Sequence, residues 1–258
     1  MIIIIDSKKA KDSFVSLFQN LRHNSASISM KLTLSGLHIQ CMDKSTICLA
    51  DLKLDASWFN SYDLEGDEPL NLCVDSALFY SIISIKSEDQ QLIIKKQETN
   101  DYLEIEFNNL INNSDYNKYF KLNLIDNEYE EMLFPDVDYD AEFSIQTKNI
   151  IQMFNQLNNF GNILKIKCNE ETINLITEDN NTFMKININC DDLNGYSITE
   201  GEDLELNYNL NYINKMCMLN KLTEVVEFSL SKEYPLKISY DLGTSSQLLF
   251  YLASTANS

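Results

Sequence analysis

The residues best spaced for chemistry are Asp136, Asp138 and Asp140, which alternate along the chain like the start of an EF-hand calcium loop. Such a loop supplies oxygen ligands from alternate positions, turns sharply at a glycine and ends on a bidentate glutamate. Here Ala141 stands where the glycine belongs and Thr147 where the glutamate belongs. The sequence therefore predicts a solvated acidic start to a strand, with no metal bound.

Cysteine and histidine offer no second metal chemistry, because the chain has no CxxC pair and neither histidine has a ligand-spaced cysteine nearby. His38 alternates with apolar neighbours, so we expect it on a strand, facing solvent or other strands rather than acting as a base. Reduced, half-buried thiols of an intracellular protein are expected at Cys41, Cys48, Cys73, Cys168, Cys190 and Cys217.

No catalytic constellation assembles from the remaining residues. The six glycines lack the spacing of a phosphate-binding loop, and no Ser/His/Asp or Cys/His arrangement is suggested. An acidic hydrolase of two similar β-rich domains would need paired carboxylates in a cleft, and the sequence offers no candidate pair. We therefore expect no enzyme activity, no cofactor and no catalytic residue.

Charge sets a further constraint, because the formal net charge is −19 and Arg22 is the sole arginine. A protein this acidic is repelled by nucleic acid unless its cations gather on one surface, which argues against a simple DNA-binding domain. Thirteen tyrosines and thirteen phenylalanines supply enough apolar surface for a folded core. The apolar start, residues 1–5, is too short to span a bilayer and reads as a buried strand.

Hydrophobic periodicity predicts the elements that position these residues. Ser7 is the expected N-cap of the first helix, and the turn Ser35-Gly36 is expected to join a hairpin. In the first half we predict helices at 7–22 and 75–85 and strands at 26–34, 37–42, 91–96 and 102–107. In the second half we predict helices at 146–160 and 208–219 and strands at 163–168, 172–177, 183–189, 224–230 and 235–241.

The two halves repeat one order of elements. Leu70-Asn71-Leu72 precedes one helix, and Leu204-Glu205-Leu206 precedes another 134 positions later, close to half of the 258 residues. Two head-to-tail copies of one β-rich domain explain such a repeat, and chance similarity between two α+β domains is the alternative. We assign the domains to residues 1–122 and 140–258, joined by a connector at 123–139. Its apolar trio Met132-Leu133-Phe134 must pack down or receive a partner.

The segment Gly36 to Leu49 resembles the proliferating-cell nuclear antigen (PCNA) family, whose members carry a Gly-hydrophobic-x-hydrophobic-Gln-x-Met-Asp-x-Ser stretch here. Further matches run in family order over essentially the whole chain. They are Ser57-Trp58-Phe59-Asn60-Ser61-Tyr62, Ser114-Asp115-Tyr116, Phe134-Pro135, Tyr234-Pro235-Leu236 and Phe250-Tyr251-Leu252-Ala253.

The resemblance implies an α+β fold with two tandem copies of the DNA-clamp domain, in which sheets lie outside and two helices per domain line a ring. Three subunits would close that ring head to tail. The strand from Tyr116 to Lys121 of one subunit would pair with the strand from Phe183 to Ile188 of its neighbour, which removes two exposed sheet edges.

The resemblance also implies a pocket beneath the connector that binds short peptides from polymerases, nucleases and ligases. Its residues in this sequence are Met42, Thr46, Ile47, Leu49, Met132, Phe134, Tyr139, Tyr234, Pro235, Tyr251 and Ala253. Leu49 and Tyr251 could instead be core residues. Two departures from the family, Thr46 in place of a histidine and Ser254 in place of a proline, predict altered partner preference.

By the same resemblance, ring-lining helices contact DNA phosphates without reading bases. The residues expected to face DNA are Lys8, Lys9, Lys11, Arg22, Lys86, Lys148, Gln152, Asn155, Asn159, Lys215 and Lys221. Gln152, Asn155 and Asn159 replace basic residues, so we expect weak, salt-sensitive contact; an ordinary solvated face is the alternative. Glu170 stands where relatives carry a modified lysine.

Together these features indicate a homotrimeric DNA sliding clamp that tethers replication and repair enzymes and is opened by a clamp loader. The alternative within the fold is a subunit of a heteromeric checkpoint-type clamp, or a clamp-derived factor that slides little. Nuclear residence follows from the resemblance alone. A divergent member encoded by a DNA virus that replicates in the cytoplasm would fit the sequence equally well.

Overall fold

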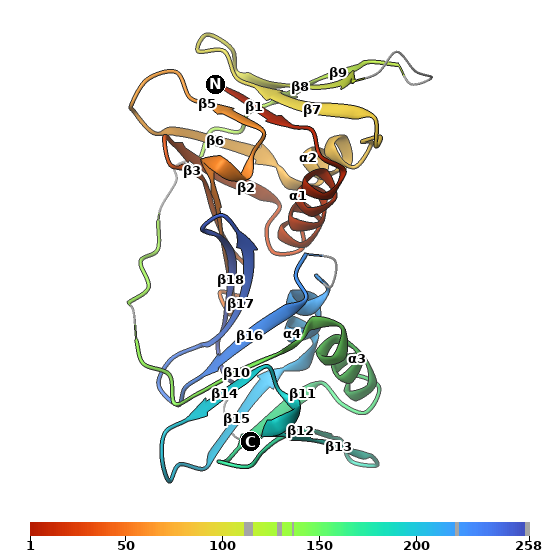
Figure 1. The fold of residues 1–258 in the computed structure, drawn as a ribbon, viewed down its shortest axis with the longest axis vertical. Coiled ribbons are helices and arrows are strands. Elements are labelled where there is room, and N and C mark those ends of the chain that lie inside the picture. The colour runs from red at the N-terminus through yellow and green to blue at the C-terminus, as the bar shows by residue number, and fades with distance from the viewer. Residues whose placement is uncertain (111–115, 128–130, 136, 220–221, 256–258) are drawn as a thin grey trace. The chain divides into compact units, whose positions relative to one another are not determined.

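The computed structural model of the chain describes residues 1–110, 116–127, 131–135, 137–219 and 222–255 (Figure 1). These residues divide into two compact units. The first contains residues 1–44, 50–132 and 242–248, and the second contains residues 45–49, 133–241 and those from 249 onward. No helix among the described residues combines the length and the apolar character needed to cross a membrane.

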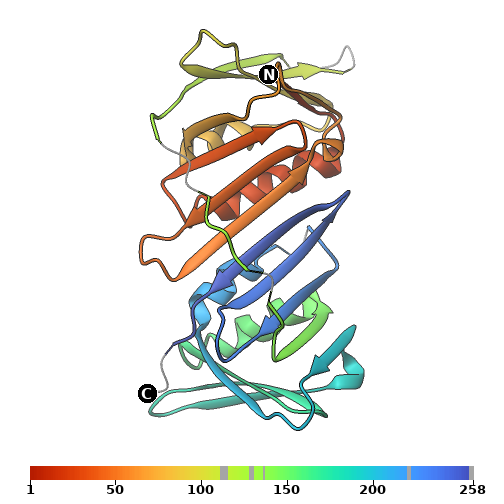
Figure 2. The ribbon, with the colours of Figure 1, turned by 90° about the vertical axis from the view of Figure 1, so that its left-hand side faces the viewer.

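The first unit places two neighbouring helices, α1 (Lys8–Leu21) and α2 (Ser76–Ile83), behind its strands (Figure 2). Its five-stranded sheet has the order β5 (Ser61–Asp63), β1 (Ile2–Ile5), β7 (Gln90–Lys95), β8 (Tyr102–Asn109) and β9 (Lys118–Asn123), and all pairs are antiparallel. A second run of strands has the order β4 (Cys48–Asp55), β3 (Gly36–Met42), β2 (Ser27–Thr33) and β6 (Leu70–Asp75).

Local chemistry fixes the ends of these elements. The Ser7 hydroxyl accepts a hydrogen bond from the Ala10 amide and begins α1, as the sequence predicts. The β2–β3 turn lies one residue earlier than predicted, at Leu34-Ser35, and β3 starts at Gly36. Gly36 has φ +141°, and a Cβ there would lie 2.1 Å from the Leu54 carbonyl oxygen, so only glycine fits.

Aromatic side chains fill the core under α1 and α2. The ring centroid of Phe18 lies 4.7 Å from those of both Phe14 and Phe79. All three side chains are buried, and strand β2 alternates buried and half-buried residues along its length. Burying aromatic rings removes a large apolar area from water, so this cluster holds the two helices together.

The second unit repeats the arrangement with helices α3 (Thr147–Leu157) and α4 (Leu210–Cys217). One run of strands has the order β14 (Gly195–Ile198), β10 (Ala141–Gln146), β16 (Val225–Leu230), β17 (Leu236–Gly243) and β18 (Ser246–Leu252). A four-stranded sheet has the order β13 (Phe183–Asn189), β12 (Thr172–Glu178), β11 (Ile163–Cys168) and β15 (Leu204–Asn209).

Both units follow the same order of elements along the chain, which confirms the predicted duplication. Each runs strand, helix, three strands, a short 3-10 helix, two strands, helix and three strands. The 3-10 helices, Ala56–Trp58 and Cys190–Asp192, occupy the same place in each order. Phe228 in the second unit packs against Phe143 and Phe154, with centroids 4.8 and 6.0 Å away.

Candidate partner-binding site

The second half of the connector is attached to the second unit by an aromatic stack. The Phe134 ring lies 4.2 Å from the Tyr251 ring of β18, centroid to centroid, with the planes 6° apart. Phe134 is still 38% exposed, so part of the ring faces water. Two predicted site residues are thus brought together, and part of their apolar surface is exposed.

Residues 45–49 and the end of β18 lie beside this stack within the same unit. The Ala253 amide donates a hydrogen bond to the Ile47 carbonyl oxygen at 2.9 Å. Thr46 has φ +56°, a strained conformation that turns the chain sharply before Ile47. Leu49 is only 2% exposed, so the structure places this side chain in the core.

Tyr139 and the segment before β17 complete the second unit's share of the predicted site. The Lys237 ammonium lies 4.5 Å from the centroid of the Tyr139 ring. Burial, with smaller contributions from Tyr251 and Glu142, raises the pKa of Tyr139 to about 12, so its phenol stays protonated. Tyr234 is 37% exposed and Pro235 is half-buried.

The first half of the connector is attached to the first unit through Gln40 on β3. The Met132 amide donates to the Gln40 side-chain oxygen at 2.8 Å, and the Gln40 side-chain nitrogen donates to the Met132 carbonyl oxygen at 3.0 Å. This pair of bonds imitates the pairing of two strands. Met42, another predicted site residue, is half-buried at the end of the same strand.

His38 continues this face of β3 and meets two carboxylates. Its Nε2 lies 2.8 Å from Asp51 Oδ1 on β4, and its Nδ1 lies 3.7 Å from Glu131 Oε1 in the connector. Lys31 on β2 lies 2.8 Å from the other Glu131 oxygen. Sequence reasoning placed His38 on a strand but assigned neither His38 nor Gln40 to the site. Their signal is the period of two, which places residues 38, 40 and 42 on one face of a strand.

Both carboxylates hold their charge more strongly than an isolated side chain would. Burial alone would raise the pKa of Asp51, but hydrogen bonds from His38 and Gln40 outweigh it, and the pKa is lowered. The hydrogen bond from Lys31 is the largest cause of the lowered pKa of Glu131. Connector and sheet are therefore joined by a network of ionised groups.

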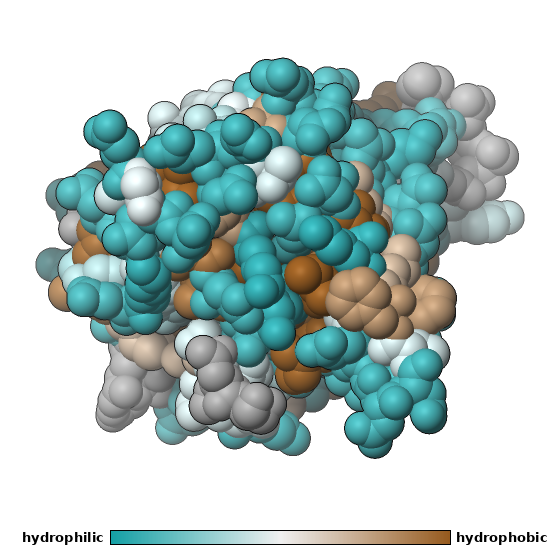
Figure 3. All heavy atoms as spheres, turned by 90° about the horizontal axis from the view of Figure 1, so that it is seen from below, coloured by the Kyte–Doolittle hydropathy of each residue, from teal (hydrophilic) through white to brown (hydrophobic). Residues whose placement is uncertain are grey.

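The two predicted edge strands each lie at the end of a sheet, β9 in the first unit and β13 in the second. Exposed aromatic rings lie at both, because Tyr116, two residues before β9, is 86% exposed and Phe183, in β13, is 63% exposed. Lys121 is exposed, whereas the Ile188 side chain is buried and only its backbone belongs to the edge. Figure 3 shows hydrophobic side chains standing out in small groups on a largely hydrophilic face.

Sequence profiles of one family match both halves of the chain. The profile described as Proliferating cell nuclear antigen, N-terminal domain, matches residues 3–131, and the C-terminal domain profile matches residues 133–255. The chain belongs to the PCNA family. Its two matched regions meet at Met132, the connector residue to which Gln40 is bonded.

Similar proteins and structures agree with this membership. Proliferating cell nuclear antigen of Chaetomium thermophilum is 25% identical over 224 residues and 85% of each chain. A DNA polymerase sliding clamp of Thermococcus fumicolans is 24% identical over 97% of this chain and 96% of its own. A PCNA2–PCNA3 complex of Sulfolobus tokodaii (TM-score 0.85, 19% identity, 100% of both chains) and the PCNA of Entamoeba histolytica (0.84, 20%, 99% and 98%) share the fold.

Some of the cations predicted to face DNA in this PCNA-family chain pair with carboxylates or an aromatic ring, and others are exposed. Lys8 pairs with Glu88 and Lys86 pairs with Asp12. The Arg22 guanidinium lies 3.9 Å from the centroid of the Tyr80 ring. Lys9, Lys148 and Lys215 are exposed, and Lys221 lies outside the described residues.

The prediction that Lys11 faces DNA is wrong. Its side chain is 1% exposed, and its ammonium group donates to the carbonyl oxygens of Ser87, Glu88 and Gln90. Lys11 therefore caps the turn between α2 and β7 from inside the unit, where no phosphate can reach it.

Helix α3 presents neutral amides where the family resemblance implies cations. Gln152 and Asn155 are exposed on its surface. Asn159 lies beyond its last turn and donates to the carbonyl oxygens of Asn155 and Gln156, so it caps the helix end. All three predicted amides are thus exposed to solvent, and Asn159 also bonds to the end of the helix.

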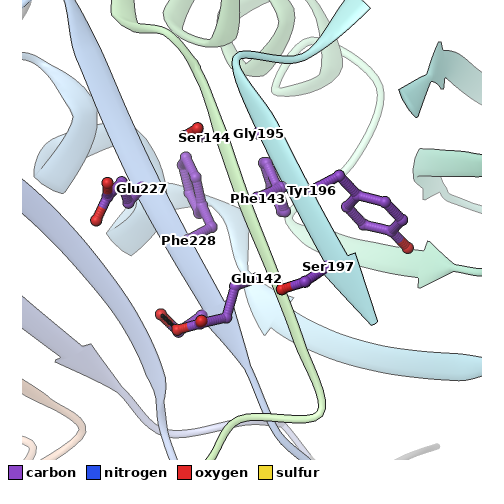
Figure 4. Close-up of a pocket in the computed structure, with 9 residues that line it drawn as sticks. Glu142, Phe143, Ser144, Gly195, Tyr196, Ser197, Glu227 and Phe228 are labelled. Atoms are coloured by element: carbon purple, nitrogen blue, oxygen red, sulfur yellow. Dashed lines mark hydrogen bonds between the residues drawn. The ribbon is translucent and has the colours of Figure 1, made fainter. Parts of the chain in front are cut away.

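A hollow of about 230 Å³ lies on β14, β10 and β16 and was not predicted (Figure 4). Glu142 and Glu227 come from neighbouring strands, and the Ser229 hydroxyl donates to Glu142 at 2.8 Å. Of the three alternating aspartates, Asp136 lies outside the described residues and Asp140 accepts a hydrogen bond from the Lys232 amide. The described residues contain no carboxylate, thiol or imidazole cluster fit for a metal.

Proposed function

We propose that this chain acts as a DNA sliding clamp, a processivity factor that closes into a ring around duplex DNA and holds replication and repair enzymes there. The observation that carries the proposal is the match of PCNA profiles to both halves, residues 3–131 and 133–255. Relatives that match 97% of the chain bear the name DNA polymerase sliding clamp. No step of this function requires catalysis.

We propose that three copies close the ring by pairing β9 of one subunit with β13 of the next. Each strand lies at the end of its sheet, so its outer backbone groups can accept another strand. Tyr116 and Phe183 are exposed, and covering them in the contact would remove their apolar surface from water, which is favourable. A head-to-tail contact of this kind joins two different edges and closes when the rotation allows it.

Partner enzymes would dock by a short peptide on the connector site. The Phe134–Tyr251 stack offers partly exposed aromatic surface, and Ile47, Tyr234 and Ala253 lie within the same unit. A one-turn helix with aliphatic and aromatic side chains suits such a surface. Modest affinity suffices, because tethering raises the local concentration of the enzyme at its substrate. A polymerase, a clamp loader, a nuclease and a ligase are the expected partner classes.

Contact with DNA would be weak. Lys9, Lys148 and Lys215 are exposed cations on or beside the helices, and Gln152 and Asn155 offer amide hydrogen bonds instead of charge. A closed ring needs little affinity, because its linkage to DNA is topological. Sliding also benefits from contacts that read no base.

The solution mass of the purified chain tests the ring. Light scattering on a sizing column near physiological salt should report three times the 29.8 kDa of one chain. A stable monomer would sink the homotrimer and favour a heteromeric clamp. Retention of the trimer on nicked circular DNA, and its loss when that DNA is linearised, would then separate a sliding ring from a trimer that does not encircle DNA.

A further inference from the structure

His38 lies in a cluster of charged groups that joins the connector to the first unit. The cluster contains Lys31 on β2, His38 on β3, Asp51 and Lys53 on β4, and Glu131 in the connector. The His38 side chain is only 13% exposed, and that of Asp51 only 8%. Changes of charge on His38 therefore act on close, partly desolvated neighbours.

The imidazole can satisfy both carboxylates only when both its nitrogens carry protons. A neutral ring has one N–H, and the 2.8 Å contact with Asp51 Oδ1 requires that proton on Nε2. The Nδ1 lone pair then faces Glu131 Oε1 at 3.7 Å, which is repulsive. A charged ring donates toward Glu131 as well, and the repulsion becomes attraction.

We propose that His38 is a positioning residue whose protonation fastens residues 131 and 132 of the connector to β3, so that partner peptides bind more tightly as the imidazole becomes charged. This inference rests on the proposed peptide-binding function of the connector. The Gln40 amide holds the Met132 backbone in either state, and His38 adds the proton-dependent part of the attachment. A connector already held in place loses less freedom on binding.

The two carboxylates of the cluster keep their charge at the pH values at which the proposal is tested. The pKa values of Asp51 and Glu131 are both lowered, so both carboxylates stay ionised around neutral pH, where an imidazole titrates. Lys31 holds one Glu131 oxygen throughout, and Lys53 adds a constant positive charge near both carboxylates. The direction of the effect is therefore set by His38: attachment is strongest at the acidic end of this range and is lost as pH rises.

The chain offers a matched control, because its only histidines are His23 and His38. His23 is exposed just beyond the end of α1, on a different element from the members of the cluster. We would compare the full-length wild type with His38→Gln and His23→Gln. Glutamine can still donate to Asp51 but cannot gain a proton, so in His38→Gln the side chain at position 38 stays uncharged at every pH.

Two readouts separate the inference from the proposed function. Nuclear magnetic resonance would follow the Met132 amide and the imidazole protons between about pH 6 and about pH 8. Fluorescence anisotropy would measure binding of an uncharged, fluorescein-labelled synthetic peptide whose single helical turn carries one aliphatic and two aromatic side chains.

In the wild type and in His23→Gln, the Met132 amide should shift with the same midpoint as the His38 ring, and peptide affinity should rise about two- to fivefold toward pH 6. In His38→Gln both dependences should disappear. Equal pH dependence in His38→Gln and wild type would overturn the inference. A titrating Met132 amide with no peptide binding at any pH would refute the peptide-binding function and leave the proton-dependent attachment standing.

Discussion

The rings of Phe134 and Tyr251 lie 4.2 Å apart and almost parallel, although 117 positions separate them in the chain. This stack holds the second half of the connector, while Gln40 and His38 hold the first half. The two attachments differ in chemistry. One depends on apolar contact and is indifferent to pH, and the other depends on charge.

Replacing Phe134 with alanine should weaken peptide binding about tenfold or more, because a central aromatic contact carries a large share of such binding energy. Stability should change by less than about 1.5 kcal/mol, since the ring is already 38% exposed. Anisotropy and urea unfolding measure the two effects. Leu133→Ala, at a neighbour that is 87% exposed, is the control and should bind normally. Equal losses in both variants would show that the connector's apolar character matters and the stack does not.

The sequence predicts the regular elements well where periodicity extends over a full element. The strands at 163–168 and 183–189 have the predicted bounds, and all four helices lie where expected. The short strands β5 and β14 were not predicted, because three or four residues are too few to establish a period of two. Duplication of the order was visible because each half repeats the same sequence of long elements.

The candidate site could be predicted only in part. Resemblance supplied Phe134 and Tyr251, and their stack bears on that expectation without testing peptide binding. The bonds from His38 and Gln40 to the connector join residues more than 90 positions apart, and no local pattern encodes such a contact. Lys11 was misjudged because lysine usually faces solvent. Its spacing from Phe14 and Phe18, three and seven residues on, does place it on the buried face of α1.

Lys11→Met should lower the free energy of unfolding by about 3 kcal/mol. The substitution keeps the aliphatic length but leaves the carbonyl oxygens of Ser87, Glu88 and Gln90 without their buried donor. Urea unfolding followed by circular dichroism measures the loss. Lys9→Met, at an exposed position two residues earlier, should change stability by less than about 0.5 kcal/mol. A loss of the same size at both positions would contradict the assigned role of Lys11.

Phe183→Glu should convert the proposed trimer to monomer. Pairing with β9 would remove a charge on the β13 edge from water. Burying that charge without a partner costs free energy, so the association constant of the subunits should fall. Light scattering over a dilution series would show the mass falling toward one chain. Leu34→Glu introduces the same charge at a turn residue that is 58% exposed, against 63% for Phe183, and should leave the mass unchanged. A trimer that survives Phe183→Glu would place the interface elsewhere.

Adding positive charge to α3 should strengthen its contact with DNA phosphates. Gln152 and Asn155 lie three residues apart, on one face of the helix, and both are exposed. The double variant Gln152→Lys/Asn155→Lys should bind a short duplex more tightly at low salt, with the slope of log affinity against log salt steeper by up to about 1.8. Fluorescence anisotropy over a salt series measures both quantities.

The control for that variant adds the same two charges away from the helices, as Asn71→Lys/Gln97→Lys, at exposed positions on β6 and after β7. Reduced net charge alone would strengthen binding equally in both double variants, because it acts through the long-range field. A steeper slope in the α3 variant only would assign the effect to phosphate contacts made by that helix face. Equal slopes would mean that α3 does not face DNA and that its exposed amides are an ordinary solvated surface.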